Sequence, residues 1–171
     1  MTNNPLKNLV NINDLQQKAE IDKLGQIQRE ARQFNKQNKT RKVFITRGEK
    51  CELEFDSKFE SGNLAAAIYT DEDEFDLILQ NDTNTQGYTQ WFFFKIKHNG
   101  PYAKEFTFSL VNHVKSDSLF NYGMKVLTSI EQPEGGFAWR RTCTEISYEQ
   151  NNFKREVTAE SRFFYSLRFT T

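Results

Sequence analysis

Trp139, Arg140 and Arg141 are the side chains whose chemistry points most directly to a ligand. A guanidinium group binds a carboxylate through two parallel hydrogen bonds, and an indole ring stacks on flat or cationic groups. The three residues could therefore bind an acidic peptide. Alternation along a strand would place Arg141 on the same side as Trp139 and Arg140 on the other side. The sequence favours the plainer interpretation, a core tryptophan beside surface arginines.

His98 and His113 are the two histidines of the chain, and neither begins a His-x-x-Glu pair. A catalytic zinc needs three protein ligands and one open position for water. Asp117 and Ser118 follow His113, but closeness in sequence does not establish a Ser-His-Asp geometry, and no G-x-S-x-G elbow is present. We predict no catalytic residue, no metal site and no cofactor in this chain. Purified protein should contain no zinc and should not hydrolyse a glutamate-tailed peptide.

Three polar segments are better explained as connections between strands than as ligand sites. Residues 82–85 (Asp-Thr-Asn-Thr) lack the glycine and the bidentate glutamate of a calcium loop, so a local turn is expected. The four acids at 71–74 predict a solvated loop. In residues 59–64 we predict that Gly62 takes a positive φ and that Asn63 bonds local backbone.

Residues 1–42 form a basic arm, with nine Lys or Arg against four acids, whereas residues 43–171 hold fourteen against nineteen. Apolar residues at a helical period predict an amphipathic helix in this arm. A solvated arm is the commoner meaning of such charge, although contact with an acidic partner is the alternative. A sequence pI of 6.7 argues against nucleic-acid binding. The cations that could contact an acidic partner are Lys36, Lys39, Arg41 and Lys42.

Cysteine usage and apolar runs predict a cytoplasmic protein. Cys51 and Cys143 are too sparse for a disulfide framework, which favours a reducing compartment. The amino terminus lacks both the basic region and the apolar region that a secretory signal contains. The apolar run at residues 91–94 is far shorter than the ~20 residues that a membrane helix needs.

From Lys42 onward the chain changes to short alternating runs rich in Phe, Tyr, Ile and Val. Such runs without helical patterns between them predict an all-β fold, an antiparallel β-sandwich of about nine or ten strands over residues 43–171. The expected strands are Lys42–Thr46, Cys51–Phe59, Leu64–Tyr69, Phe75–Leu79, Gln90–His98, Glu105–Asn112, Met124–Ser129, Phe137–Arg141, Thr144–Tyr148 and Phe163–Thr170.

The run from Trp91 to His98 begins apolar on both faces, which predicts a strand that is central at that end. Asn99-Gly100-Pro101 follows and signals a turn. We therefore expect the run that starts at Glu105 to return antiparallel beside it, and this hairpin to supply much of the core.

Several longer strings resemble the amino-terminal domain of the cytosolic carboxypeptidases. They lie in the same order and spacing over residues 55–171. Weaker similarities are Gly136 with Trp139 and Arg141, and the closing residues 165–169. The main strings are Phe59–Leu64, Asp76–Leu79, Asp82–Thr85 with Gly87, Thr89–Phe94, Asn112 with Lys115, and Asp117–Met124.

This resemblance implies a β-sandwich that precedes a zinc carboxypeptidase domain, which removes glutamate from tubulin and other proteins. The catalytic domain is absent from this sequence, so zinc is expected only in that missing part. The expected role is a non-catalytic packing and substrate-positioning domain, whose partner is the catalytic domain or an acidic, tubulin-like tail.

Two alternatives remain open at this point. The chain could be the front portion of an active carboxypeptidase that is completed downstream. It could also be a stand-alone structural protein of microtubules or cilia, anchored by its amino-terminal helix. The sequence does not decide whether the chain is a fragment or a complete gene product, which face binds a partner, whether the helix docks, or the oligomeric state.

Overall fold

The computed structural model describes residues 44–46, 52–85, 87–132, 134–157 and 160–171. The predicted helix and the cations Lys36, Lys39, Arg41 and Lys42 lie outside the described residues. No helix in the described ranges is long and apolar enough to cross a membrane.

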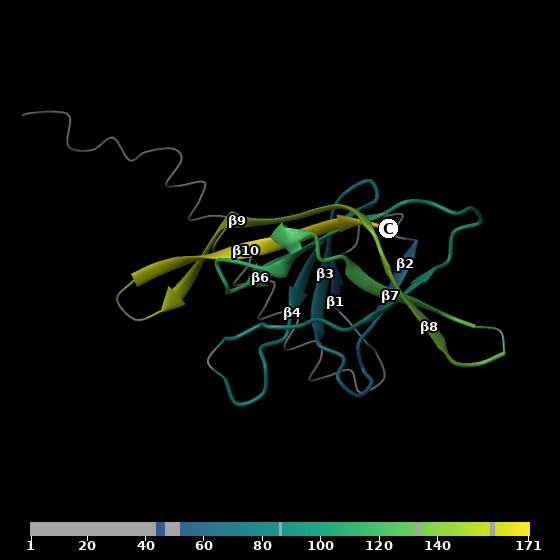
Figure 1. The fold of residues 1–171 in the computed structure, drawn as a ribbon, viewed down its shortest axis with the longest axis horizontal. Coiled ribbons are helices and arrows are strands. Elements are labelled where there is room, and N and C mark those ends of the chain that lie inside the picture. The colour runs from purple at the N-terminus through teal and green to yellow at the C-terminus, as the bar shows by residue number, and fades with distance from the viewer. Residues whose placement is uncertain (1–43, 47–51, 86, 133, 158–159) are drawn as a thin grey trace, which may run out of the picture.

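Ten strands and one short 3-10 helix make up the described structure (Figure 1). The predicted all-β fold is confirmed. The elements are β1 (Phe44–Thr46), β2 (Leu53–Asp56), β3 (Leu64–Asp71), β4 (Glu74–Leu79), β5 (Lys95–His98), β6 (Thr107–His113), η2 (Leu119–Tyr122), β7 (Val126–Glu131), β8 (Phe137–Thr142), β9 (Thr144–Val157) and β10 (Glu160–Thr170).

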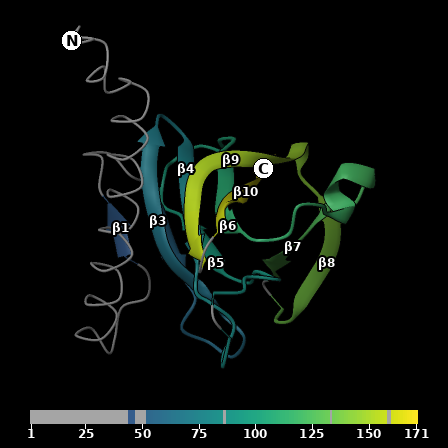
Figure 2. The same ribbon diagram turned by 90° about the vertical axis from the view of Figure 1, so that its left-hand side faces the viewer.

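The described strands form one six-stranded sheet in the order β1-β3-β4-β6-β10-β9 and two small sheets, β2-β5 and β7-β8. Leu53 and Phe55 of β2 and Val126 of β7 share one buried cluster with side chains of the large sheet, so the two small sheets pack as a second layer against it. Figure 2 shows β7 and β8 on the side of the large sheet away from β1 and β3. All six residues of β8 are exposed, so this hairpin lies at the surface of the domain.

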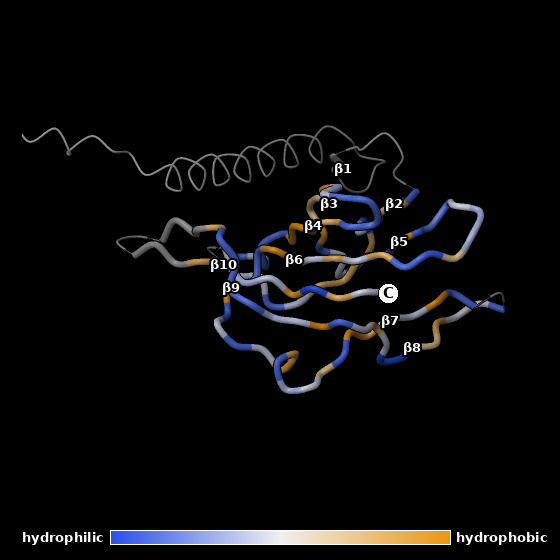
Figure 3. The backbone as a smooth tube through the Cα atoms, turned by 90° about the horizontal axis from the view of Figure 1, so that it is seen from above, coloured by the Kyte–Doolittle hydropathy of each residue, from blue (hydrophilic) through white to orange (hydrophobic). Residues whose placement is uncertain are grey.

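Aromatic side chains fill the space between the layers. Phe55 of β2 contacts Phe75 of β4 and Phe108 of β6, with ring centroids 5.4 and 6.2 Å apart. All three rings are buried. In Figure 3, hydrophobic (orange) segments occur at β4 and β6, the strands that carry Phe75 and Phe108. Burial of this aromatic face is the main stabilisation of the two-layer fold.

The large sheet is mixed rather than antiparallel, because β4 pairs with β6 in parallel, as β1 does with β3. The chain leaves β4, passes through β5 in the second layer and returns as β6 beside β4. A parallel pair requires such a crossover. The predicted hairpin between the strands on either side of residues 99–101 is therefore wrong, because β5 pairs with β2 and β6 pairs with β4 and β10.

Residues 91–94 do not form the predicted central strand. They belong to the crossover, and their rings diverge to different partners. Phe92 stacks near Phe169 with centroids 6.4 Å apart, whereas Phe93 meets Phe59 at 5.0 Å. An apolar run indicates burial on several sides but does not distinguish a central strand from an irregular segment.

Asn63 holds this crossover in place. Its side-chain Nδ2 donates to the carbonyl of Trp91 at 2.8 Å, and its Oδ1 accepts from the amide of Phe93 at 2.8 Å. The prediction that Asn63 bonds local backbone is therefore wrong. The predicted positive φ also belongs to Ser61 (φ 66°) and not to Gly62. Gly62 is required for space, because an added Cβ would lie 2.1 Å from the carbonyl oxygen of Ser57.

Asn112, near the end of β6, also bonds backbone groups through its side chain, here those of Leu79 at the end of β4. Its Oδ1 accepts from the amide of Leu79 and its Nδ2 donates to the carbonyl of Leu79, both at 2.9 Å. The carbonyl of Asn112 accepts from the hydroxyl of Thr89. One buried residue thus joins the end of β4 through its side chain and the start of the crossover through its backbone carbonyl.

The acidic turn at 71–74 is only partly the solvated loop that the sequence predicts. Glu74 accepts a bidentate contact from Arg168, with the shorter distance 2.7 Å, and Asp73 lies 2.6 Å from the Lys104 ammonium. Asp76 follows on the same face of β4 as Glu74. Burial raises the pKa of Asp76 to about 6, against a lowering by the Arg168 charge and a further rise from Glu74.

We predict that Asn112→Ala lowers the free energy of unfolding by about 2–4 kcal/mol, because the amide and the carbonyl of Leu79 lose their partner in a buried site. Urea denaturation of the full chain measures this change. Asn121→Ala is the matched control, since Asn121 is exposed and its one side-chain contact, with Asp117, is 3.5 Å long. A loss below about 0.5 kcal/mol in Asn112→Ala would contradict the bridging role.

We predict that Asp76→Asn raises the free energy of unfolding at pH 7 by about 1–2 kcal/mol. The folded carboxyl has a pKa of about 6, above its ordinary value of 3.8, so ionisation disfavours the folded state and stability falls as pH rises through this interval. The gain of the variant should vanish below about pH 4. Denaturation at pH 4 and pH 7, with the exposed carboxylate variant Glu149→Gln as control, measures it. An equal effect at both pH values would contradict this account.

Candidate functional site

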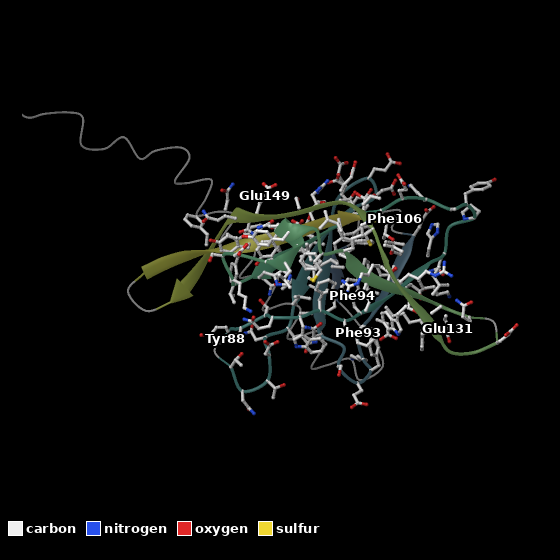
Figure 4. All side chains as sticks on the ribbon, viewed as in Figure 1. Tyr88, Phe93, Phe94, Phe106, Glu131 and Glu149 are labelled. Carbon is white, nitrogen blue, oxygen red and sulfur yellow. The ribbon has the colours of Figure 1, made fainter. Side chains whose placement is uncertain are left out.

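A groove with a volume of about 820 Å³ opens between the β7-β8 hairpin and the body of the domain. Its walls come from the crossover residues 89–93, the segment 115–125 that contains η2, and the side chains of Leu127, Trp139 and Arg141. His113 at the end of β6 and Tyr148 of β9 also line it. Figure 4 places Phe93 in the crossover and Glu131 on the hairpin. The site therefore combines segments that are far apart in the sequence.

Side chains alternate between the two faces of β8, and this alternation separates Arg140 from Trp139 and Arg141. Trp139 and Arg141 both line the groove. Arg140 lies between them in the strand and therefore points to the opposite face of the hairpin. The structure thus brings two of the three candidate residues together and separates the third.

Trp139 is not the core residue that the sequence favoured, because it remains 49% exposed. Its ring lies 5.8 Å from that of Phe93 and 6.4 Å from that of Phe137. The hairpin is also attached to the body by the ion pair between Lys95 and Glu131, at 2.8 Å. Trp139 is therefore an aromatic surface held in place at the mouth of the groove.

His113 is one of the residues that line the groove, and it is only 7% exposed. Its Nδ1 lies 3.3 Å from the carbonyl oxygen of Thr89, which can only accept, so Nδ1 carries the proton of this hydrogen bond. Burial lowers the pKa of His113, which keeps the imidazole neutral. Its Nε2 is buried and has no hydrogen-bond partner among the described residues.

Aromatic rings flank the His113 imidazole. The Phe92 ring lies 6.3 Å from it and the Tyr148 ring 5.9 Å. The Tyr148 hydroxyl donates to the carbonyl of Lys115 at 2.7 Å, and burial raises its pKa to about 12, so it remains a donor. This bond ties the segment that follows β6 to β9.

The charges that line the groove are mainly positive. Lys115, Lys125 and Arg141 line it, against the single carboxylate of Asp117. Asp117 already accepts from the amide of Ser118 at 2.8 Å and from the hydroxyl of Tyr122 at 3.2 Å. In the described part of the chain, none of the three cations has an ion-pair partner. The groove therefore presents free positive charge beside aromatic surface.

Ser118, His113 and Asp117 share the groove but do not form a catalytic array. Ser118 caps η2, because its hydroxyl oxygen accepts from the amide of Phe120 at 3.4 Å. The carboxylate of Asp117 is engaged by η2 as described above. Neither side chain is hydrogen-bonded to His113, whose Nδ1 contacts Thr89 instead. The geometry for acyl transfer is therefore not assembled.

The described residues do not fit a zinc ion. His98 lies 3.4 Å from Glu52 and its ring packs on Phe106 at 5.2 Å, whereas His113 is enclosed by rings. Over the described ranges, no three His, Cys, Asp or Glu side chains gather as metal ligands would. Residues 82–85 form a turn closed by the Thr85 hydroxyl, which donates to the carbonyl of Asp82 at 2.8 Å. The absence of zinc and turnover stays a prediction.

Four residues that line the groove were not predicted as site residues from the sequence: His113, Lys115, Lys125 and Tyr148. One signal could have pointed to them. The strings quoted for the family resemblance, 89–94 and 112–124, both enter the groove wall. Trp139 and Arg141, quoted as a weaker similarity, complete it.

The family described as the cytosolic carboxypeptidase N-terminal domain matches residues 55–169. This chain belongs to that family. The cytosolic carboxypeptidase N-terminal domain described here is 40% identical to cytosolic carboxypeptidase 1 of Danio rerio over 124 residues. It is 39% identical to cytosolic carboxypeptidase 1 of Homo sapiens over 124 residues and 36% identical to cytosolic carboxypeptidase 2 of Xenopus tropicalis over 121 residues.

The matched region of this cytosolic carboxypeptidase N-terminal domain is 69–70% of the chain but only 10–12% of each of these three relatives. The chain thus spans about a tenth of the length of the relatives it matches. The similarity concerns their N-terminal domain.

Proposed function

We propose that this cytosolic carboxypeptidase N-terminal domain is a non-catalytic packing and substrate-positioning module. It acts with a zinc carboxypeptidase domain on glutamate-rich, tubulin-like tails. The observation that carries the proposal is the pairing of Trp139 and Arg141 on one wall of a groove, where no described carboxylate neutralises Arg141.

Acidic tails suit the chemistry of this wall. The planar guanidinium of Arg141 can bind a carboxylate through two hydrogen bonds, and the neighbouring indole offers a flat surface for the rest of the residue. Lys115 and Lys125 add positive charge to the lining of the groove. A glutamate-rich segment would meet three cations, whereas a basic segment would be repelled.

The groove mouth also has the apolar character of a protein-binding surface. Trp91, Leu119, Tyr122 and Leu127 all line the groove and all remain exposed. Contiguous exposed apolar side chains with a polar edge are typical of interaction sites. This supports a role in which the domain packs beside its catalytic partner and holds a substrate between them.

The relatives are named cytosolic carboxypeptidases, which supports a cytoplasmic location for this domain. Association with microtubules or cilia belongs to the same proposal, since tubulin tails would be the substrate. The alternative is that the chain is the front portion of an active carboxypeptidase. The length of the relatives favours this alternative, because they are about ten times longer than the matched region.

We predict that Arg141→Glu weakens binding of a fluorescent glutamate-tailed peptide to the full chain by at least about tenfold, and Trp139→Ala by about five- to tenfold. Fluorescence anisotropy at low salt measures both. Arg140→Glu is the matched control, because it makes the same charge change in the same strand on the opposite face, and its affinity should stay within about twofold of the unmodified chain.

Two outcomes would contradict the proposal. Equal losses in Arg140→Glu and Arg141→Glu would mean that the peptide responds to net charge and not to the groove. No measurable binding by the unmodified chain would remove acidic-tail positioning altogether.

A further inference from the structure

The face of the large sheet that points away from the second layer carries a buried apolar row. Ala66 of β3 pairs with Ile78 of β4, and the register between β4 and β6 places Val111 next to Ile78. These three side chains are 0%, 1% and 3% exposed, and they form a cluster separate from the aromatic core. Central side chains on an open sheet face would remain in contact with water, so this burial implies a layer over the row.

No element in the described part of the chain supplies that layer. The partly buried apolar side chains that pack on the row, Ala65, Ile68 and Phe153, also come from the large sheet. The small sheets and η2 pack on its other face, because β2, β5, β7 and η2 each contribute a side chain to the aromatic core and β8 pairs with β7. Among the segments outside the described residues, residues 1–43 have the length to cover three strands, whereas the others are five residues or shorter.

The sequence of the arm has a pattern and a length that suit this face. Apolar residues recur at intervals of three or four, which predicts one apolar stripe along a helix. These residues are Leu24, Ile27, Ala31 and Phe34. A helix over residues 21–34 would be about 20 Å long, which is about the width of four strands. Residues 35–43 then lead to β1, whose first residue, Phe44, is the register partner of Ala66.

The charges of the arm and of this face are complementary. Residues 1–42 hold nine Lys or Arg against four acids. The face carries Glu74 and Asp76 of β4 and Glu149 of β9, because the strand neighbours of these residues face the core. Arg168 of β10 pairs with Glu74 at 2.7 Å. The remaining carboxylates favour a basic segment over an acidic one beside the apolar row.

We infer that residues 21–34 form an amphipathic helix that docks on this outer face and covers the row of Ala66, Ile78 and Val111. The domain then has three layers, with the arm on one side of the large sheet and the small sheets on the other. The inference is independent of the proposed function, because it concerns the face opposite the aromatic core. It assigns the apolar stripe of the arm to the domain's own sheet and not to an anchor on another protein.

Methyl NMR of the full chain tests the contact directly. In a sample with labelled Ile, Leu and Val methyl groups, Ile78 and Val111 should show nuclear Overhauser contacts to the methyl groups of Leu24 or Ile27. A mixture of labelled and unlabelled chains then tells whether the helix belongs to the same molecule. Contacts that occur only between two molecules, or no contact between residues 21–34 and the row, would overturn the inference.

Urea denaturation of the full chain gives a second measurement. Ile27→Asp places a charge in the apolar stripe and should lower the urea midpoint by about 0.5–1 M. Gln33→Asp is the matched control, because it makes the same charge change on the opposite side of the predicted helix. Its midpoint should stay within about 0.2 M of that of the unmodified chain. The same midpoint in Ile27→Asp and in the unmodified chain would contradict docking.

Discussion

The position of the crossover backbone between the two layers is the constraint on which the groove depends. Residues 89–94 run without a strand partner, yet buried amides and carbonyls must be hydrogen-bonded. Two asparagines meet this need. Asn63 binds the backbone of Trp91 and Phe93, and Asn112 joins the start of the crossover to the ends of β4 and β6. These bonds fix one wall and the floor of the groove together.

The groove therefore arises from the way the chain connects its layers. Because β4 and β6 are parallel, the connection must cross into the second layer, and its aromatic residues are left between the large sheet and the β7-β8 hairpin. The hairpin contributes Trp139 and Arg141, and β6 ends at His113 beneath them. Fold and site are thus consequences of the same crossover.

Strand positions could be predicted from the sequence, since alternation and turn residues identified all ten. Their partners could not. The turn at 99–101 joins strands of different sheets, and β9 continues well beyond Tyr148 because its polar residues pair with β10 at a sheet edge. Pairing depends on contacts between distant segments, which local periodicity does not contain.

The candidate site was predicted in part. Alternation correctly grouped Trp139 with Arg141, but a tryptophan in a strand usually indicates a core, whereas here it lies on a strand that is exposed at every position. His113 was considered as a catalytic residue and dismissed. Its actual partner is the carbonyl of Thr89, which the crossover brings to it and which local sequence does not reveal.

Hydrogen–deuterium exchange of the full chain, with and without a saturating glutamate-rich peptide, tests most directly whether the groove is the binding surface. The account predicts slower exchange in residues 115–125 and 137–142, and unchanged exchange in β10 residues 163–170, which lie outside the groove. Slower exchange confined to β10, or none in any segment, would contradict it.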